Sequence, residues 1–86
     1  MGRDLYGRKI DARVRVVEGP AGSPSRFYWP DKWRPVAQII DYWRESGEWW
    51  DGEEEKDYYL IASAGGGCYE LCREAPGEWA LSRVLD

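Results

Sequence analysis

Histidine, the residue most often used for general acid–base catalysis, is absent from this chain of 86 residues. A nucleophilic serine or cysteine would therefore have no imidazole base. The only two cysteines are Cys68 and Cys72. With no second cysteine pair and no histidine, a zinc site would need carboxylates for its remaining ligands, which is an unusual set. We therefore expect no enzymatic activity, no metal site and no bound cofactor.

Long apolar runs are also lacking. No stretch approaches the roughly 18 apolar residues that span a bilayer, and the first nine residues have no signal-peptide core. On one strand, Cys68 and Cys72 would lie about 13 Å apart, beyond the limit of roughly 7 Å between the Cα atoms of a disulfide. We therefore expect free thiols and a cytoplasmic protein.

Aromatic residues are abundant instead, with six Trp, six Tyr and one Phe. Each ring can bury roughly 150 to 250 Å², so a few of them can form the core of one small domain covering residues 1–86. Residues 1–44 hold nine Lys or Arg and five Asp or Glu, whereas residues 45–86 hold three and eleven. With a net charge of -4, a uniformly basic nucleic-acid binder is disfavoured, but a local basic patch is not.

Alternating apolar and polar residues predict strands. The clearest pattern lies in residues 9–19, where Ile10, Ala12, Val14 and Val16 would form the buried face. Glycine, proline and serine in residues 19–25 then predict a flexible loop. Similar patterns predict further strands in four segments. They are residues 25–29, the two arms of a hairpin with a Gly-rich connection in residues 57–74, and residues 77–86 with Trp79, Leu81 and Leu85 on one face.

Residues 33–45 fit two interpretations. Val36, Ile40 and Trp43 fall at helical spacing, and Pro35 suits the first position of a helix. Ala37, Ile39 and Trp43 instead fit one face of a strand. The β-branched and aromatic residues of this segment favour the strand. Six antiparallel strands in a meander then predict an all-β fold. At this size we expect the sheet to curl into a small, partly open barrel, which reduces its exposed edges. An open edge would leave both a monomer and a homodimer as candidates.

The segment RFYWPDKWR, residues 26–34, concentrates four aromatic and three cationic side chains. If Phe27 and Trp29 face inward, other side chains would form an outer binding surface. These candidates are Arg26, Tyr28, Lys32, Trp33 and Arg34. Trp, Tyr and Arg are typical anchors of protein interfaces, and the same set suits single-stranded nucleic acid. A third interpretation makes Trp29 and Trp33 cross-strand partners in the core.

Several motifs resemble, in order, an uncharacterised family of small bacterial domains. These motifs are RFYW, W-x-P-V-x-x-I-I-x-x-W in residues 33–43, GEWW in residues 47–50, DYYLI, GGGCYEL and EWALSRVLD. The family is similar to the C-terminal appendage of the Y-family polymerase homologue of the bacterial mutasome. The resemblance covers roughly residues 8–86 and implies an accessory β domain of DNA repair or translesion synthesis, without an active site.

The sequence therefore predicts a non-enzymatic module that binds a protein partner and is accessory to DNA repair. A domain that binds single-stranded nucleic acid is the alternative. In both interpretations the predicted surface in residues 26–34 makes the contact.

Overall fold

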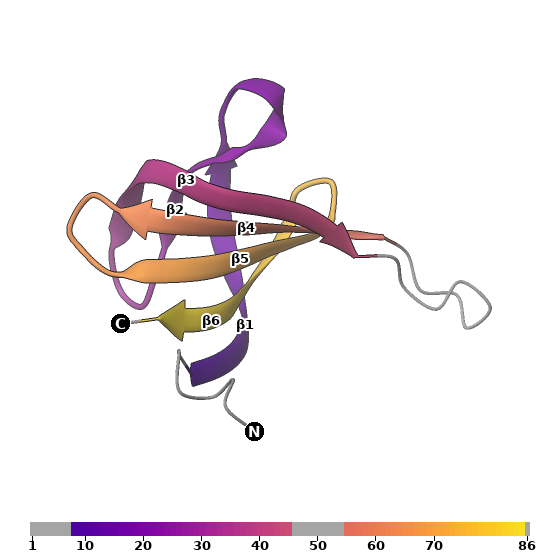
Figure 1. The fold of residues 1–86 in the computed structure, drawn as a ribbon. Helices are drawn as coiled ribbons and strands as arrows, with labels where there is room; N and C mark the ends of the chain where they lie inside the picture. The colour runs from indigo at the N-terminus through magenta and orange to yellow at the C-terminus, as the bar shows by residue number, and fades with distance from the viewer. Residues whose placement is uncertain (1–7, 46–54, 86) are drawn as a thin grey trace.

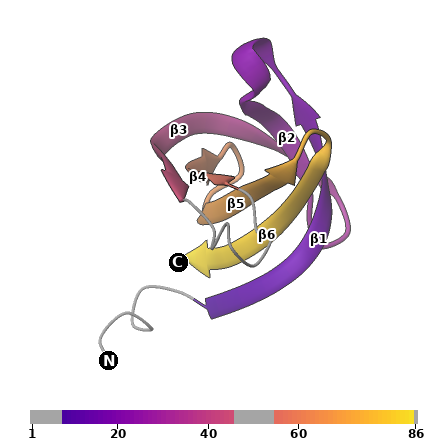
Figure 2. The same cartoon turned by 90° about the vertical axis from the view of Figure 1, so that its right-hand side faces the viewer.

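The computed structural model describes residues 8–45 and 55–85, which form six antiparallel β-strands. The strands are β1 (Arg8–Glu18), β2 (Pro24–Tyr28), β3 (Trp33–Glu45), β4 (Lys56–Ser63), β5 (Cys68–Ala75) and β6 (Glu78–Leu85). Each strand pairs with the next along the chain, and β6 pairs with β1 (Figures 1 and 2). The predicted all-β barrel of six strands is confirmed, and the pairing of β1 with β6 closes it.

Strand β3 settles the ambiguity of residues 33–45, which are extended throughout. Its pairing with β4 shifts between Val36 and Gln38 and again between Ile39 and Asp41, as β-bulges do. Each bulge changes which side chains face the barrel. Trp43 consequently lies opposite Tyr58, outside the barrel, and not on one face with Ile39 as simple alternation predicts.

The barrel interior is filled mainly by aromatic side chains and by branched aliphatic side chains. The most deeply buried side chains are Phe27, Ile61, Leu71, Trp79 and Leu81, with Tyr59 and Tyr69 beside them. Ile10, Val14 and Val16 pack against this core from β1, as the alternation predicts. In β6, however, Val84 packs against the core, and Leu85 lies opposite Cys68. A bulge near Ser82 changes the direction of the side chains that follow it.

The connection between β1 and β2 is shorter than the predicted loop of residues 19–25. Pro20–Gly22 form one turn of 3₁₀-helix, and β2 already begins at Pro24, which is buried. Hydrogen bonds close the turn, including Gly19 N–H to the Ser23 carbonyl oxygen at 2.7 Å. The described residues contain no helix of the length and apolarity that crossing a membrane requires. The GEWW motif lies outside the described residues.

Candidate functional site

Three short stretches of strand bring a group of cationic and aromatic side chains to the outside of the barrel. Arg15 of β1 pairs with Tyr28 of β2, and Tyr28 pairs with Trp33 of β3. Arg26 lies two residues before Tyr28, so its side chain points to the same outer face. We call Arg15, Arg26, Tyr28 and Trp33 the basic–aromatic surface.

Direct contacts hold this surface together. The ring centroids of Tyr28 and Trp33 lie 5.4 Å apart at an interplanar angle of 79°. The guanidinium of Arg26 lies 5.2 Å from the Trp33 ring centroid, and that of Arg15 lies 6.0 Å from the Tyr28 ring centroid. Such cation–π contacts contribute about 0.5 to 1 kcal/mol at exposed sites. The side chains are therefore ordered by one another, although Trp33 remains 40% exposed.

Arg15 and Arg26 of this surface, and Lys32 in the turn beside it, form no ion pair in the part of the chain that the structure describes. The ion pairs within residues 8–45 and 55–85 involve other basic side chains. A guanidinium stacked on a ring still presents N–H donors at its edge. The surface therefore offers donors to an anionic group.

The structure brings most of the predicted binding residues together but not all of them. Arg26, Tyr28 and Trp33 share the outer face, and Lys32 is exposed in the turn beside them. The predicted placement of Arg34 on this surface is wrong. Its Nε–H donates to the Trp29 carbonyl oxygen, and its guanidinium lies 5.8 Å from the ring centroid of buried Tyr69.

Arg15 is the member of the surface that the predicted binding residues omit. Its position on the wet face of β1 follows from alternation, but its neighbours depend on how β1 pairs with β2, which the sequence does not show. In the third interpretation, Trp29 and Trp33 are cross-strand partners in the core. The structure instead pairs Trp33 with Tyr28. Trp29 is half-buried and packs against the core.

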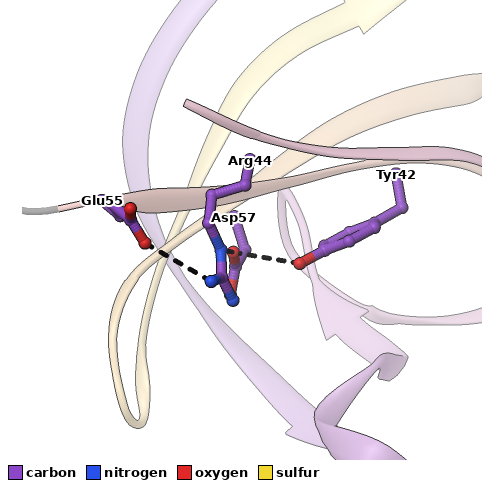
Figure 3. Close-up of polar contacts among 4 residues, drawn as sticks. All are labelled: Tyr42, Arg44, Glu55 and Asp57. Carbon is purple, nitrogen blue, oxygen red and sulfur yellow. Dashed lines mark hydrogen bonds and ion pairs between the residues drawn. The ribbon is translucent and has the colours of Figure 1, made fainter. Parts of the chain in front are cut away.

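A second polar cluster lies at the end of β3 and the start of β4, where Asp57 also pairs with Arg73 of β5. We call Tyr42, Arg44, Glu55 and Asp57 the β3–β4 cluster (Figure 3). Asp57 Oδ1 accepts hydrogen bonds from Arg44 Nε at 2.8 Å and from the Tyr42 hydroxyl at 3.2 Å. Arg44 also contacts Glu55 Oε1 at 3.3 Å through its Nη1 atom.

Charge and burial compete in this cluster. Burial alone would raise the pKa of Asp57, but the hydrogen bonds from Arg44 and Tyr42 and the positive charge of Arg44 outweigh it and lower that pKa. The same hydrogen bond raises the pKa of Arg44. Both partners are therefore held in their charged forms, and the cluster ties neighbouring strands to each other.

Cys72 is the buried thiol of the chain, and Cys68 is half-buried; both are free, as predicted. Cys72 pairs with Tyr58, whose ring stacks on Trp43 at 5.5 Å with an interplanar angle of 4°. Burial raises the pKa of Cys72 and, together with the neighbouring thiol, that of Tyr58. A thiol kept protonated in this way is a weak nucleophile.

Other chemistry-bearing features are modest in the described part of the chain. A shallow depression of about 350 Å³ is lined by Arg13, Val14, Gly77, Glu78 and Trp79. Among residues 8–45 and 55–85, no three side chains of the kinds that ligate metals converge. The basic–aromatic surface, in which Arg15, Arg26 and Trp33 are exposed, is therefore the candidate site among the residues that the structure describes.

Comparison with known proteins places the chain in a family. The family described as a domain of unknown function, DUF6504, matches residues 5–86. The chain belongs to this family. The match confirms the resemblance to an uncharacterised domain family that the sequence motifs indicate. No curated protein and no solved structure matches the chain.

Proposed function

We propose that this DUF6504 domain is a non-enzymatic interaction module that binds an acidic segment of a protein partner through its basic–aromatic surface. The observation that carries the proposal is the position of Arg26. Its guanidinium lies over the exposed ring of Trp33, without a carboxylate partner among the described residues. Arg and Trp are residues that dominate the binding energy of protein interfaces.

The arrangement of the rings supports a protein partner over a nucleic acid. Arg26 lies over the ring of Trp33, and Arg15 lies over the ring of Tyr28. A base that stacked on either covered ring face would have to displace a guanidinium, whereas a carboxylate can bind the free N–H edge of that guanidinium.

A single-stranded nucleic acid is the second candidate. It is favoured by one observation, the collection of Arg15, Arg26 and Lys32 beside Tyr28 and Trp33. Cations that follow a phosphate backbone beside stacking rings are typical of such binding. Titration with an oligothymidylate at low salt would quench tryptophan fluorescence, and the affinity would fall as salt is added. Absence of quenching would remove this candidate.

The resemblance to the appendage of the mutasome polymerase homologue supports a role in DNA repair or translesion synthesis in the cytoplasm. In this proposal, the partner is a repair protein that carries an acidic segment. The domain then recruits or positions that protein, and the chemistry takes place elsewhere.

The test uses the full chain as bait in a bacterial lysate, followed by mass spectrometry and binding measurements with the purified partner. The double variant Arg26→Ala, Trp33→Ala should lose at least about tenfold in affinity, because two interface anchors are removed. The matched control is Trp43→Ala, Arg83→Ala, which removes the same residue types elsewhere on the barrel. Circular dichroism checks that both variants fold.

Three outcomes would contradict the proposal. Equal partner binding by the two double variants would show that the contact lies elsewhere. Loss of the β-type spectrum in Arg26→Ala, Trp33→Ala would show that these side chains hold the barrel together. Binding that does not weaken with rising salt would argue against an acidic partner.

A further inference from the structure

Strand β3 is longer than the strand that pairs with its first residues. β2 pairs with Trp33, Arg34 and Pro35, whereas the pairing with β4 runs from Val36 to Glu45. In Figure 1, β3 and β4 continue side by side toward the right of the view. Within residues 8–45 and 55–85, the edge of β3 that faces away from β4 has no partner strand beyond Pro35.

Exposed apolar side chains collect on this part of β3. Ile39, Ile40 and Tyr42 are 39%, 46% and 46% exposed, respectively. Natural proteins usually protect a free sheet edge with charges, prolines, bulges or a short strand. β3 has two bulges in its first part, but its pairing with β4 is regular from Asp41 to Glu45. This regular stretch carries the charges Asp41, Arg44 and Glu45, so a strand that continues the sheet here must bring side chains that match them.

The backbone of this stretch also presents donors and acceptors. Tyr42 N–H donates to the side chain of Asp41, to Oδ1 at 2.8 Å, so it is directed away from β4. Because amides alternate in direction along a strand, the N–H and C=O of Arg44 point the same way. The side chains of Tyr42 and Arg44 are held by Asp57, which keeps the strand in position (Figure 3).

We propose that an extended segment of another polypeptide adds as an antiparallel strand to the edge of β3 along Asp41–Glu45. A row of alternating N–H and C=O groups is satisfied best by another peptide backbone. Asp41 and Glu45 lie opposite β4 residues on the outer face, and Tyr42 lies opposite Tyr59 on the inner face. The matching segment therefore carries basic residues facing outward and apolar residues facing inward.

A second copy of this chain fits the same edge less well. Two-fold symmetric pairing along the regular stretch would centre on Trp43 and place Asp41 of one copy opposite Glu45 of the other. This would happen twice, and like charges directly opposite each other destabilise a sheet. A separate segment with basic residues at those two positions meets the carboxylates with opposite charge.

The test uses a probe peptide, the capped heptapeptide Thr-Lys-Val-Thr-Val-Lys-Thr, and the full chain labelled for NMR. Its lysines would lie opposite Asp41 and Glu45, and its valines opposite Tyr42 and Arg44. At saturating peptide, amide hydrogen exchange at Arg44 should slow by about tenfold or more, because this amide becomes hydrogen-bonded to the peptide backbone. The amide of Tyr42 already donates to Asp41 and would exchange that exposed acceptor for a backbone carbonyl. The same peptide with both valines N-methylated keeps its side chains but loses the donors, and should leave the exchange unchanged.

Two variants separate the contributions. Glu45→Lys should weaken peptide binding by roughly two- to five-fold, because one cross-strand charge pair becomes repulsive. Trp33→Ala should leave it unchanged, so that failure of this proposal and failure of the basic–aromatic surface are distinguishable.

Four results would overturn the strand addition. The first is no slowing with the heptapeptide, and the second is equal slowing with the N-methylated peptide. The third is slow exchange of Arg44 in the dilute free protein, and the fourth is slowing that follows protein concentration without peptide. The last of these would assign the edge to a second copy.

Discussion

Arg26 and Arg44 place the same guanidinium group in two contrasting surroundings. Arg26, in the basic–aromatic surface, contacts the Trp33 ring at 5.2 Å. Arg44, in the β3–β4 cluster, lies between Asp57 and Glu55 at 2.8 and 3.3 Å. In the cluster the positive charge is neutralised within the molecule and fastens strands together. In the basic–aromatic surface the ring orients the guanidinium but leaves its charge available to a partner.

The largest expected effect tests whether the basic–aromatic surface is separate from the core beneath it. Phe27 and Tyr28 are neighbours in β2, but Phe27 is fully buried and Tyr28 only half-buried. Phe27→Ala should cost about 3 to 5 kcal/mol of unfolding free energy, as truncation of buried aromatic residues does. Tyr28→Ala should cost about 1 kcal/mol. Urea denaturation measures both values, and equal losses would assign Tyr28 to the core.

The next effect concerns the pH dependence of the β3–β4 cluster. The folded protein lowers the pKa of Asp57 below its ordinary value of 3.8, so folding favours the charged carboxylate. The stability that Asp57 contributes is therefore present above pH 3.8 and is lost as the pH falls below that value toward the folded pKa.

Asp57→Asn removes this titration, so its stability should fall less steeply in acid than that of the wild type. Urea denaturation at a series of pH values measures the two slopes. Arg26→Ala is the control and should keep the wild-type slope, because Arg26 forms no ion pair with a carboxylate in the described residues. Parallel curves for Asp57→Asn and the wild type would mean that the cluster does not stabilise the fold.

The smallest expected effect is that of Arg26→Ala on stability. Only a cation–π contact with an exposed ring is lost, so the free energy of unfolding should fall by no more than about 1 kcal/mol. The exposed Trp33 ring should become more accessible to acrylamide, measured as the difference in quenching between the wild type and this variant. A loss above about 2 kcal/mol would show that Arg26 supports the barrel.

Much of the fold follows from side-chain alternation. The inward residues of β1 and the burial of Phe27 can be predicted in this way, because successive side chains point to opposite faces. Bulges cannot be found by the same rule. Val84 packs against the core, and Leu85 does not take the predicted place, because the register shifts by one residue within β6. β-branched and aromatic content correctly favours a strand for residues 33–45.

The candidate site is predictable only in part. The separation of Arg34 from Trp33 follows from alternation, since adjacent residues on a strand cannot share a face, and the predicted surface neglects this. The inclusion of Arg15 depends instead on the register of β1 against β2, which places it opposite Tyr28. Register between distant segments is set by packing of the whole barrel, and a single sequence contains no direct record of it.

The pairing of β6 with β1 makes the sheet a ring, in which Arg8 and Val84 are opposite residues. In a closed ring of strands, the chain could begin at any strand and still form the same pairings. A short linker from residue 85 to residue 8, with new ends opened in the Gly65–Gly67 turn, would present the same six strands in a rotated chain order. Such a circular permutant should keep both proposed contact surfaces, and its new ends would lie beside the start of β5, where Cys68 pairs with Leu85.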